Sequence, residues 1–166
     1  MTREQFERLQ KPFLARPALL RALRGADKAI TALVYLAYPA LLAALLFSRD
    51  GRFLRCVLVP GVSFVAVSAL RRALNFPRPF AKLGFSPLLQ KDKPGESFPS
   101  RHVFSVFVIA FAFYYTFAPA GVVLTVLGVL LAVIRVVGGV HFPRDVVCGA
   151  GLGAACGAIG FFLVPG

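Results

Sequence analysis

The sequence predicts an all-α protein, a polytopic membrane helix bundle of about five transmembrane helices with an N-terminal interfacial amphipathic helix. The composition is the first indication: of 166 residues, 58% are hydrophobic and 16% are charged, and the mean hydropathy is +0.76. A single water-soluble core of this size could not bury so much apolar surface. The second indication is that the apolar residues gather in five runs, each close to the ~20 residues that a helix needs to cross a bilayer.

The five runs are separated by short polar or proline-containing connections. They lie at residues 29–47, 53–70, 102–118, 121–137 and 146–164. The last run carries Gly149, Gly153 and Gly157 at every fourth position. Small residues at this spacing favour close helix–helix packing in membranes, so we expect this helix to lie against a neighbour along its glycine face.

Residues 1–26 are too polar to cross a membrane. Apolar residues such as Phe6 and Leu9 alternate with basic ones such as Arg8 and Lys11. This pattern predicts a basic amphipathic segment that lies at the headgroup level and is attracted by anionic lipid, with a disordered basic tail as the alternative. Pro12 and Pro17 are expected to break or restart its helix. We therefore divide the chain into this interfacial segment and one transmembrane domain, residues 27–166.

Three polar stretches lie at helix ends that share one membrane surface, because successive spanning helices alternate in direction. These stretches are RRALNFPRPF (71–80), FPSRHVFS (98–105) and IRVVGGVHFPRD (134–145), and they contain both histidines of the chain. Ionisable side chains at this depth are costly and usually mark a functional site. Guanidinium groups match phosphate oxygens with paired hydrogen bonds, so the arginines predict a phosphate-bearing ligand.

Taken together, these stretches resemble the three-part signature of the type-2 phosphatidate phosphatase superfamily, which also contains acid phosphatases and vanadium haloperoxidases. The first part is Arg71 followed after six residues by Arg78-Pro79, and the second is Pro99-Ser100-Arg101-His102. The third is Arg135, five residues, His141, three residues and Asp145. The order and the spacing of all three parts match, and the match extends from residue 71 to about residue 160.

The resemblance implies a role for each matching residue. His141 is expected to attack phosphorus and form a phosphohistidine, Asp145 to orient its imidazole, and His102 to protonate the leaving oxygen. The residues expected to bind the substrate phosphate are Arg71, Arg78, Ser100, Arg101 and Arg135. No cluster of carboxylates accompanies these residues, so neither a metal ion nor another cofactor is expected.

Three positions depart from the family pattern. Arg71 replaces a lysine, Ile134 replaces a serine, and Arg101 replaces a glycine. The first change keeps the charge, and the second removes a hydroxyl group. The third is the largest, since glycine allows a backbone N–H to approach the phosphate closely. Arg101 must either leave that N–H accessible or add its own guanidinium to the anion site.

The expected function is that of a multi-pass cell-membrane phosphatase whose partner is a lipid phosphate or diphosphate rather than nucleic acid. The short chain is similar to bacterial undecaprenyl-diphosphate phosphatases, with phosphatidate and phosphatidylglycerophosphate as other candidate substrates. A lipid phosphotransferase with the same intermediate and a non-catalytic lipid- or anion-binding protein are the alternatives. Sixteen Lys and Arg residues lie on the motif side against three on the other, which favours a cytoplasmic site. The sequence does not determine the oligomeric state.

Overall fold

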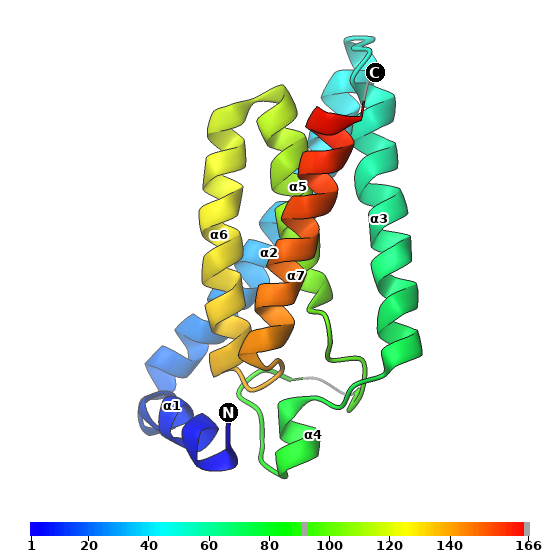
Figure 1. Ribbon diagram of the computed structural model, residues 1–166. Coiled ribbons are helices and arrows are strands. Elements are labelled where there is room, and N and C mark those ends of the chain that lie inside the picture. The colour runs from blue at the N-terminus through cyan, green and yellow to red at the C-terminus, as the bar shows by residue number, and fades with distance from the viewer. Residues whose placement is uncertain (91–92, 165–166) are drawn as a thin grey trace.

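The computed structural model describes residues 1–90 and 93–164, and every regular element in these two ranges is a helix (Figure 1). The predicted all-α class is therefore confirmed; residues 91–92, between the first two motifs in the sequence, and residues 165–166 lie outside the described part. In chain order the elements are α1 (Arg3–Ala15), α2 (Pro17–Phe47), α3 (Phe53–Leu74), α4 (Pro79–Leu83), α5 (Arg101–Thr116), α6 (Ala118–Val137), α7 (Pro143–Ala158) and a π-helical turn, η1 (Ile159–Leu163).

Four of the five predicted spans form helices that are long and apolar enough to cross a membrane. These are α2, α3, α6 and the continuous segment of α7 and η1. The remaining predicted span, residues 102–118, corresponds to α5. This helix has 16 residues and a length of about 24 Å, since an α-helix rises 1.5 Å per residue. It lies inside the bundle, where Val103, Phe104 and Val108 are fully buried. The architecture is thus the predicted polytopic bundle, built around a shorter central helix.

The glycine face of α7 packs directly on α5, as the four-residue spacing predicts. A Cβ atom added at Gly149 would lie 2.6 Å from the carbonyl oxygen of Ser100, and one at Gly153 would lie 2.6 Å from that of Phe104. The missing side chains therefore let the two backbones touch. Close packing also brings the beginnings of the two helices together, where the Ser100 N–H donates a 2.8 Å hydrogen bond to the Asp145 carbonyl oxygen.

The N-terminal segment contains α1 and the first part of α2. The restart at Pro17 is confirmed, because α1 ends at Ala15 and α2 begins at Pro17. The expected break at Pro12 is wrong: Pro12 lies inside α1, which a capping box at Thr2 and two buried side chains stabilise. From Pro17 the helix continues without interruption across residues 26–27, the boundary expected from the sequence, and the first span is the later part of α2.

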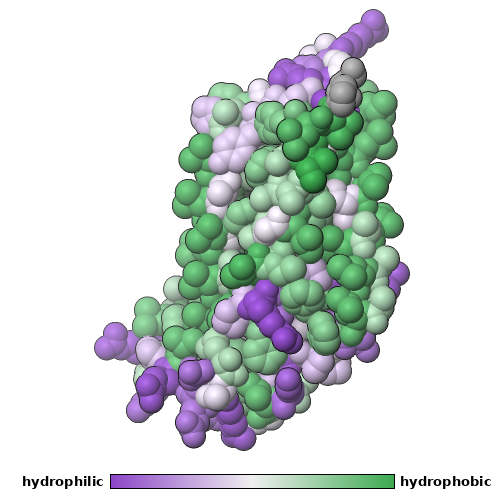
Figure 2. Space-filling view, in the orientation of Figure 1, coloured by the Kyte–Doolittle hydropathy of each residue, from purple (hydrophilic) through white to green (hydrophobic). Residues whose placement is uncertain are grey.

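On the face that Figure 2 shows, the surface is mostly apolar in the middle and polar at its two ends. Large apolar side chains such as Leu36, Phe47 and Val147 are 72%, 86% and 70% exposed. In water this exposure would be unfavourable, whereas lipid tails solvate such side chains well. The chain is a multi-pass membrane protein whose apolar girdle faces lipid.

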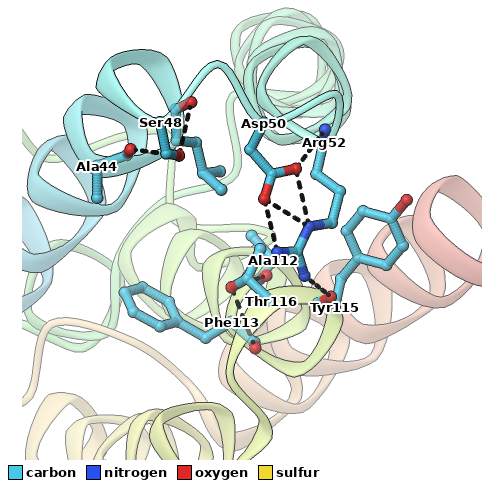
Figure 3. A network of polar contacts seen from close by, with 9 residues as sticks. Ala44, Ser48, Asp50, Arg52, Ala112, Phe113, Tyr115 and Thr116 are labelled. Carbon is cyan, nitrogen blue, oxygen red and sulfur yellow. Dashed lines mark hydrogen bonds and ion pairs between the residues drawn. The ribbon is translucent and has the colours of Figure 1, made fainter.

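The end of the bundle that carries no motif residue is closed by a small polar network (Figure 3). The Arg52 guanidinium donates to both carboxylate oxygens of Asp50, with an Nη2–Oδ2 distance of 2.6 Å, and its Nη1 donates to the Tyr115 carbonyl oxygen. The hydrogen bonds from Arg52 lower the pKa of Asp50 to about 2. This network fastens the α2–α3 hairpin to the end of α5.

Candidate active site

The His141 and Asp145 side chains lie side by side at the beginning of α7. His141 belongs to the turn between α6 and α7, and Asp145 lies in the first turn of α7. Their side chains are 1% and 0% exposed, and His141 Nδ1 is 3.7 Å from Asp145 Oδ2. The same carboxylate oxygen accepts the backbone N–H of Phe142 at 2.9 Å. The Asp145 carboxylate therefore anchors the turn that carries His141.

Ser97 is a member of this cluster that sequence analysis missed. Its hydroxyl donates a 2.6 Å hydrogen bond to Asp145 Oδ2 and lies 3.5 Å from His141 Nδ1. Ser97 is 1% exposed and stands two residues before Pro99 of the second motif. Its nearness to that motif was the only signal in the sequence. Arg144 is a further neighbour that was not among the predicted site residues, with its Nε 3.5 Å from Asp145 Oδ1.

Arg71 joins the first motif to the second. It lies in the last turn of α3, is 4% exposed, and donates from Nη1 and Nη2 to the carbonyl oxygens of Pro99 and Glu96. A guanidinium has five N–H groups, so these two contacts leave donors for a bound anion. Arg71 thus holds the loop before α5 and keeps N–H groups that are not used by these two contacts.

Arg78 joins the first motif to the third. It caps the short helix α4 and is 6% exposed. Its Nη1 donates to the Val140 carbonyl oxygen at 3.0 Å, in the residue before His141, and its Nε donates to the Gly95 carbonyl oxygen at 3.2 Å. The Arg78 guanidinium therefore contacts both the loop before α5, at Gly95, and the turn that carries His141, at Val140.

Arg135 is buried in the last turn of α6, with a side chain that is 3% exposed. Its Nε lies 2.8 Å from Oδ1 of Asp27, a residue of α2. Sequence analysis did not single out Asp27, although an acidic residue next to an apolar span was a visible signal. The carboxylate compensates the buried positive charge and fixes one edge of the guanidinium.

The second motif forms the beginning of α5. Ser100 is the residue before the helix, and its buried hydroxyl oxygen has no hydrogen-bond partner among the residues that the structure describes. His102 is half-buried and lines a small cavity of about 30 Å³ together with Thr31 and Leu131. The start of α5, next to Asp145, therefore presents backbone N–H groups and a buried hydroxyl at the same end as His141.

Arg101, the residue at the family's glycine position, lies apart from the buried arginines. It is exposed, and its guanidinium lies over the Phe64 ring of α3 at 5.5 Å from the centroid. Of the eight predicted site residues, seven are buried or half-buried at one end of the bundle, and Arg101 is at its surface. Its guanidinium therefore does not take part in the buried arginine contacts of Arg71 and Arg78.

The His141 imidazole is neutral at pH 7. Burial away from water lowers its pKa to about 4, and the positive charge of Arg78 and Arg135 acts in the same direction, while Asp145 opposes the shift. A neutral imidazole has one nitrogen lone pair, which is the group that a nucleophile requires. Because Nδ1 faces Ser97 and Asp145, Nε2 is the nitrogen left for an incoming electrophile.

These features define a class of protein: a helical membrane protein with a buried His–Asp pair and several guanidinium groups at one end of its bundle. The PAP2 superfamily matches residues 52–165, most of the chain, and the chain belongs to this superfamily. The family resemblance that the three motifs carry is thereby confirmed. The narrower similarity to undecaprenyl-diphosphate phosphatases stays a prediction.

The solved structures that are similar to this chain include two membrane phosphatases. LpxE of Aquifex aeolicus is 28% identical, with a TM-score of 0.66 over 88% of this chain and 94% of that chain. A transmembrane PAP2-type phosphatidylglycerolphosphate phosphatase from Bacillus subtilis is 23% identical, with a TM-score of 0.70 over 95% of this chain and 83% of that chain. The second likeness concerns the fold alone. No curated protein matches the chain.

Proposed function

We propose that this protein is a membrane lipid phosphatase that hydrolyses a phosphate monoester or a diphosphate headgroup through a phosphohistidine on His141. The observation that carries this proposal is the buried His141–Asp145 pair, beside which Arg78 donates a hydrogen bond to the Val140 carbonyl oxygen. Membership of the PAP2 superfamily and the similarity to LpxE, at 28% identity, give independent support.

In the first step, Nε2 of His141 attacks phosphorus, the new N–P bond forms, and the bond between phosphorus and the lipid oxygen breaks. His102 donates a proton to the departing oxygen. As the attacking imidazole becomes positive, the Asp145 carboxylate, 3.7 Å from Nδ1, stabilises that charge. In the second step, His102 accepts a proton from water, the water oxygen bonds to phosphorus, and the N–P bond breaks to release inorganic phosphate.

Fixed positive charge lowers the barrier of both steps. The non-bridging oxygens of the phosphoryl group are held by Arg71, Arg78 and Arg135, with the Ser100 hydroxyl as a further donor. Each arginine is already fixed by a carbonyl or carboxylate partner, so little reorganisation is needed when charge develops. Preorganised charge of this kind is typically the largest contribution to phosphoryl transfer.

A groove on the lipid-facing side supports a substrate with an apolar tail. It has a volume of about 270 Å³ between α2, α3 and α5, and its lining includes Tyr38, Pro60 and Phe64. Ser105 lines both this groove and the small cavity beside His102. A lipid whose tail lies in the groove would therefore have its headgroup near His102.

Undecaprenyl diphosphate is the candidate that the sequence favours, and phosphatidate and phosphatidylglycerophosphate are the other two. The site is proposed to face the cytoplasm, on the ground that Lys and Arg number sixteen on the motif side and three on the other.

We expect the purified protein in detergent to release inorganic phosphate from at least one of these three lipids, at the same rate with and without EDTA. A water-soluble phosphate monoester should be a poorer substrate because it cannot use the apolar groove. A product that forms only with a second lipid or sugar acceptor would identify a phosphotransferase instead. Binding of all three lipids without turnover would leave only a lipid-binding role and contradict the proposal.

A further inference from the structure

We propose that α1 is a positioning element for the catalytic turn, and that Phe6 and Gln10 hold His141 in its reactive place. The inference rests on the proposed function, since it assigns the role of nucleophile to His141. The turn in question is the segment 138–142 between α6 and α7. Helix α1, more than 120 residues away in the sequence, lies at the same end of the bundle as this turn (Figure 1). It contacts the turn at Phe142 and the end of α6, just before the turn, at Val137.

The first point is an aromatic contact. Phe6 is fully buried, stacks on Phe85 at a centroid distance of 5.2 Å and meets Phe142 edge-on at 5.8 Å. Phe142 directly follows His141, and its backbone N–H is bonded to the Asp145 carboxylate. A shift of the Phe142 ring would therefore move the backbone that connects the histidine to its carboxylate.

The second point is a hydrogen bond. Gln10 is 2% exposed, and its Nε2 donates to the Val137 carbonyl oxygen at 3.2 Å. Val137 is the last residue of α6, and the carbonyl groups at a helix end lack partners within the helix. Burying an amide side chain is unfavourable unless its hydrogen bonds are made. An apolar side chain would anchor α1 at a lower cost, so a glutamine here indicates that the end of α6 must be held in place.

The approach of α1 is close enough to require glycine in the turn. Gly139 has a φ of +77°, and a Cβ atom there would lie 2.6 Å from Gln10 Nε2 and 2.8 Å from the Phe85 ring. A side chain at Gly139 would be strained at this φ and would force the Gln10 amide and the Phe85 ring to shift. The sequence of the turn is therefore adapted to the helix that covers it.

The other side of the turn is held by the loop before the second motif. The backbone N–H groups of Leu88 and Leu89 both donate to the Gly138 carbonyl oxygen, at 3.0 Å and 3.3 Å. Arg78 holds the Val140 carbonyl oxygen. Once α1 is loosened, these contacts and the hydrogen bond from the Phe142 N–H to Asp145 remain, but the turn gains freedom around Gly139. Misplacement of a reacting group by about 1 Å is enough to cost up to ~100-fold in rate.

The test compares Gln10→Ala and Phe6→Ala with two control variants on exposed side chains, Gln90→Ala and Leu14→Ala. We expect the first two to lower kcat by about 10-fold to 100-fold with little change in KM, because the lipid groove lies elsewhere. Both controls should keep the wild-type kcat. A kcat within twofold of wild type for Gln10→Ala and Phe6→Ala, or an equal loss in Leu14→Ala, would overturn the inference.

A second readout needs no substrate. In a His102→Gln background, His141 is the only imidazole, and its titration is followed by NMR between pH 5 and 7.5. The parent should stay neutral throughout, since burial holds the pKa at about 4. In Gln10→Ala, water reaches the loosened turn, the pKa rises toward 6.5, and His141 titrates within this range. An unchanged titration would count against α1 as a positioning element even if phosphate release had failed for another reason.

Discussion

Replacing His141 by asparagine is expected to reduce phosphate release from the lipid substrate by at least about 10⁴-fold in kcat, because the nucleophile is removed. Asparagine has no imidazole nitrogen that could take the phosphoryl group, so water would have to attack the lipid phosphate directly. The arginines remain in place, so the variant should still bind the substrate. The measurement is the initial rate of phosphate release at saturating lipid in detergent, with wild type and variant purified in parallel.

The loss must be separated from unfolding, because His141 is 1% exposed and contacts buried groups. Asparagine fills part of the imidazole volume and keeps a hydrogen-bonding group near Ser97 and Asp145, so the thermal unfolding temperature in detergent should fall only slightly. Tight binding of the lipid with no turnover is the expected phenotype. A folded His141→Asn protein that keeps more than about 1% of the wild-type kcat would show that another group attacks phosphorus.

The second largest effect is expected for Asp145→Asn, a loss of about 10³-fold to 10⁴-fold in kcat with a smaller change in KM. Oδ2 of Asp145 accepts hydrogen bonds from the Ser97 hydroxyl and the Phe142 N–H. An amide NH₂ at that position cannot accept them, and an amide oxygen there lacks the charge that stabilises the imidazolium. The effect should therefore appear in the chemical step, measured as kcat at saturating lipid.

A matched control lies at the opposite end of the bundle. Asp50 also pairs with an arginine, Arg52, at 2.6 Å, and the pair is partly exposed. Exposed ion pairs contribute little to stability, so Asp50→Asn should keep kcat within about twofold of wild type. If both asparagine variants lost activity to the same degree, the role of Asp145 would be reduced to general stabilisation.

The fold was predictable from the sequence because membrane insertion depends on local composition. The five apolar runs, the restart at Pro17 and the glycine face of α7 are all properties of short segments. Pro12 was different: a proline inside a helix is unfavourable locally, and the buried contacts of Phe6 and Gln10 stabilise α1 around it. Tertiary packing outweighed the local preference in this case.

The candidate site was predictable only where its residues belong to a spaced motif. Asp27 and Ser97 have no motif of their own, yet they contact Arg135 and Asp145 across 108 and 48 residues of sequence. Backbone carbonyl groups, the partners of Arg71 and Arg78, carry no mark in a sequence at all. The sequence alone could not place Arg101 at the surface, because the motif was compatible with a guanidinium either inside the anion site or away from it. The structure places this guanidinium over the Phe64 ring.

The double function that we propose for the buried arginines would explain why the three motifs occur together. Arg71 and Arg78 each use part of the guanidinium to hold the backbone of another motif and have N–H groups left for phosphate. Under the proposed function, phosphate binding and the assembly of the site would depend on the same side chains. A single motif, taken alone, would place neither the anion nor the histidine.

The most direct test of the account is to trap the covalent intermediate. Wild-type protein is mixed with a lipid substrate labelled with ³²P in the transferred phosphate, quenched within milliseconds in alkali, digested and analysed by mass spectrometry. The account predicts an acid-labile, alkali-stable phosphate on the peptide that contains His141, and none in His141→Asn. Rapid phosphate release with no label on His141 at any time, or with the label on His102, would contradict it.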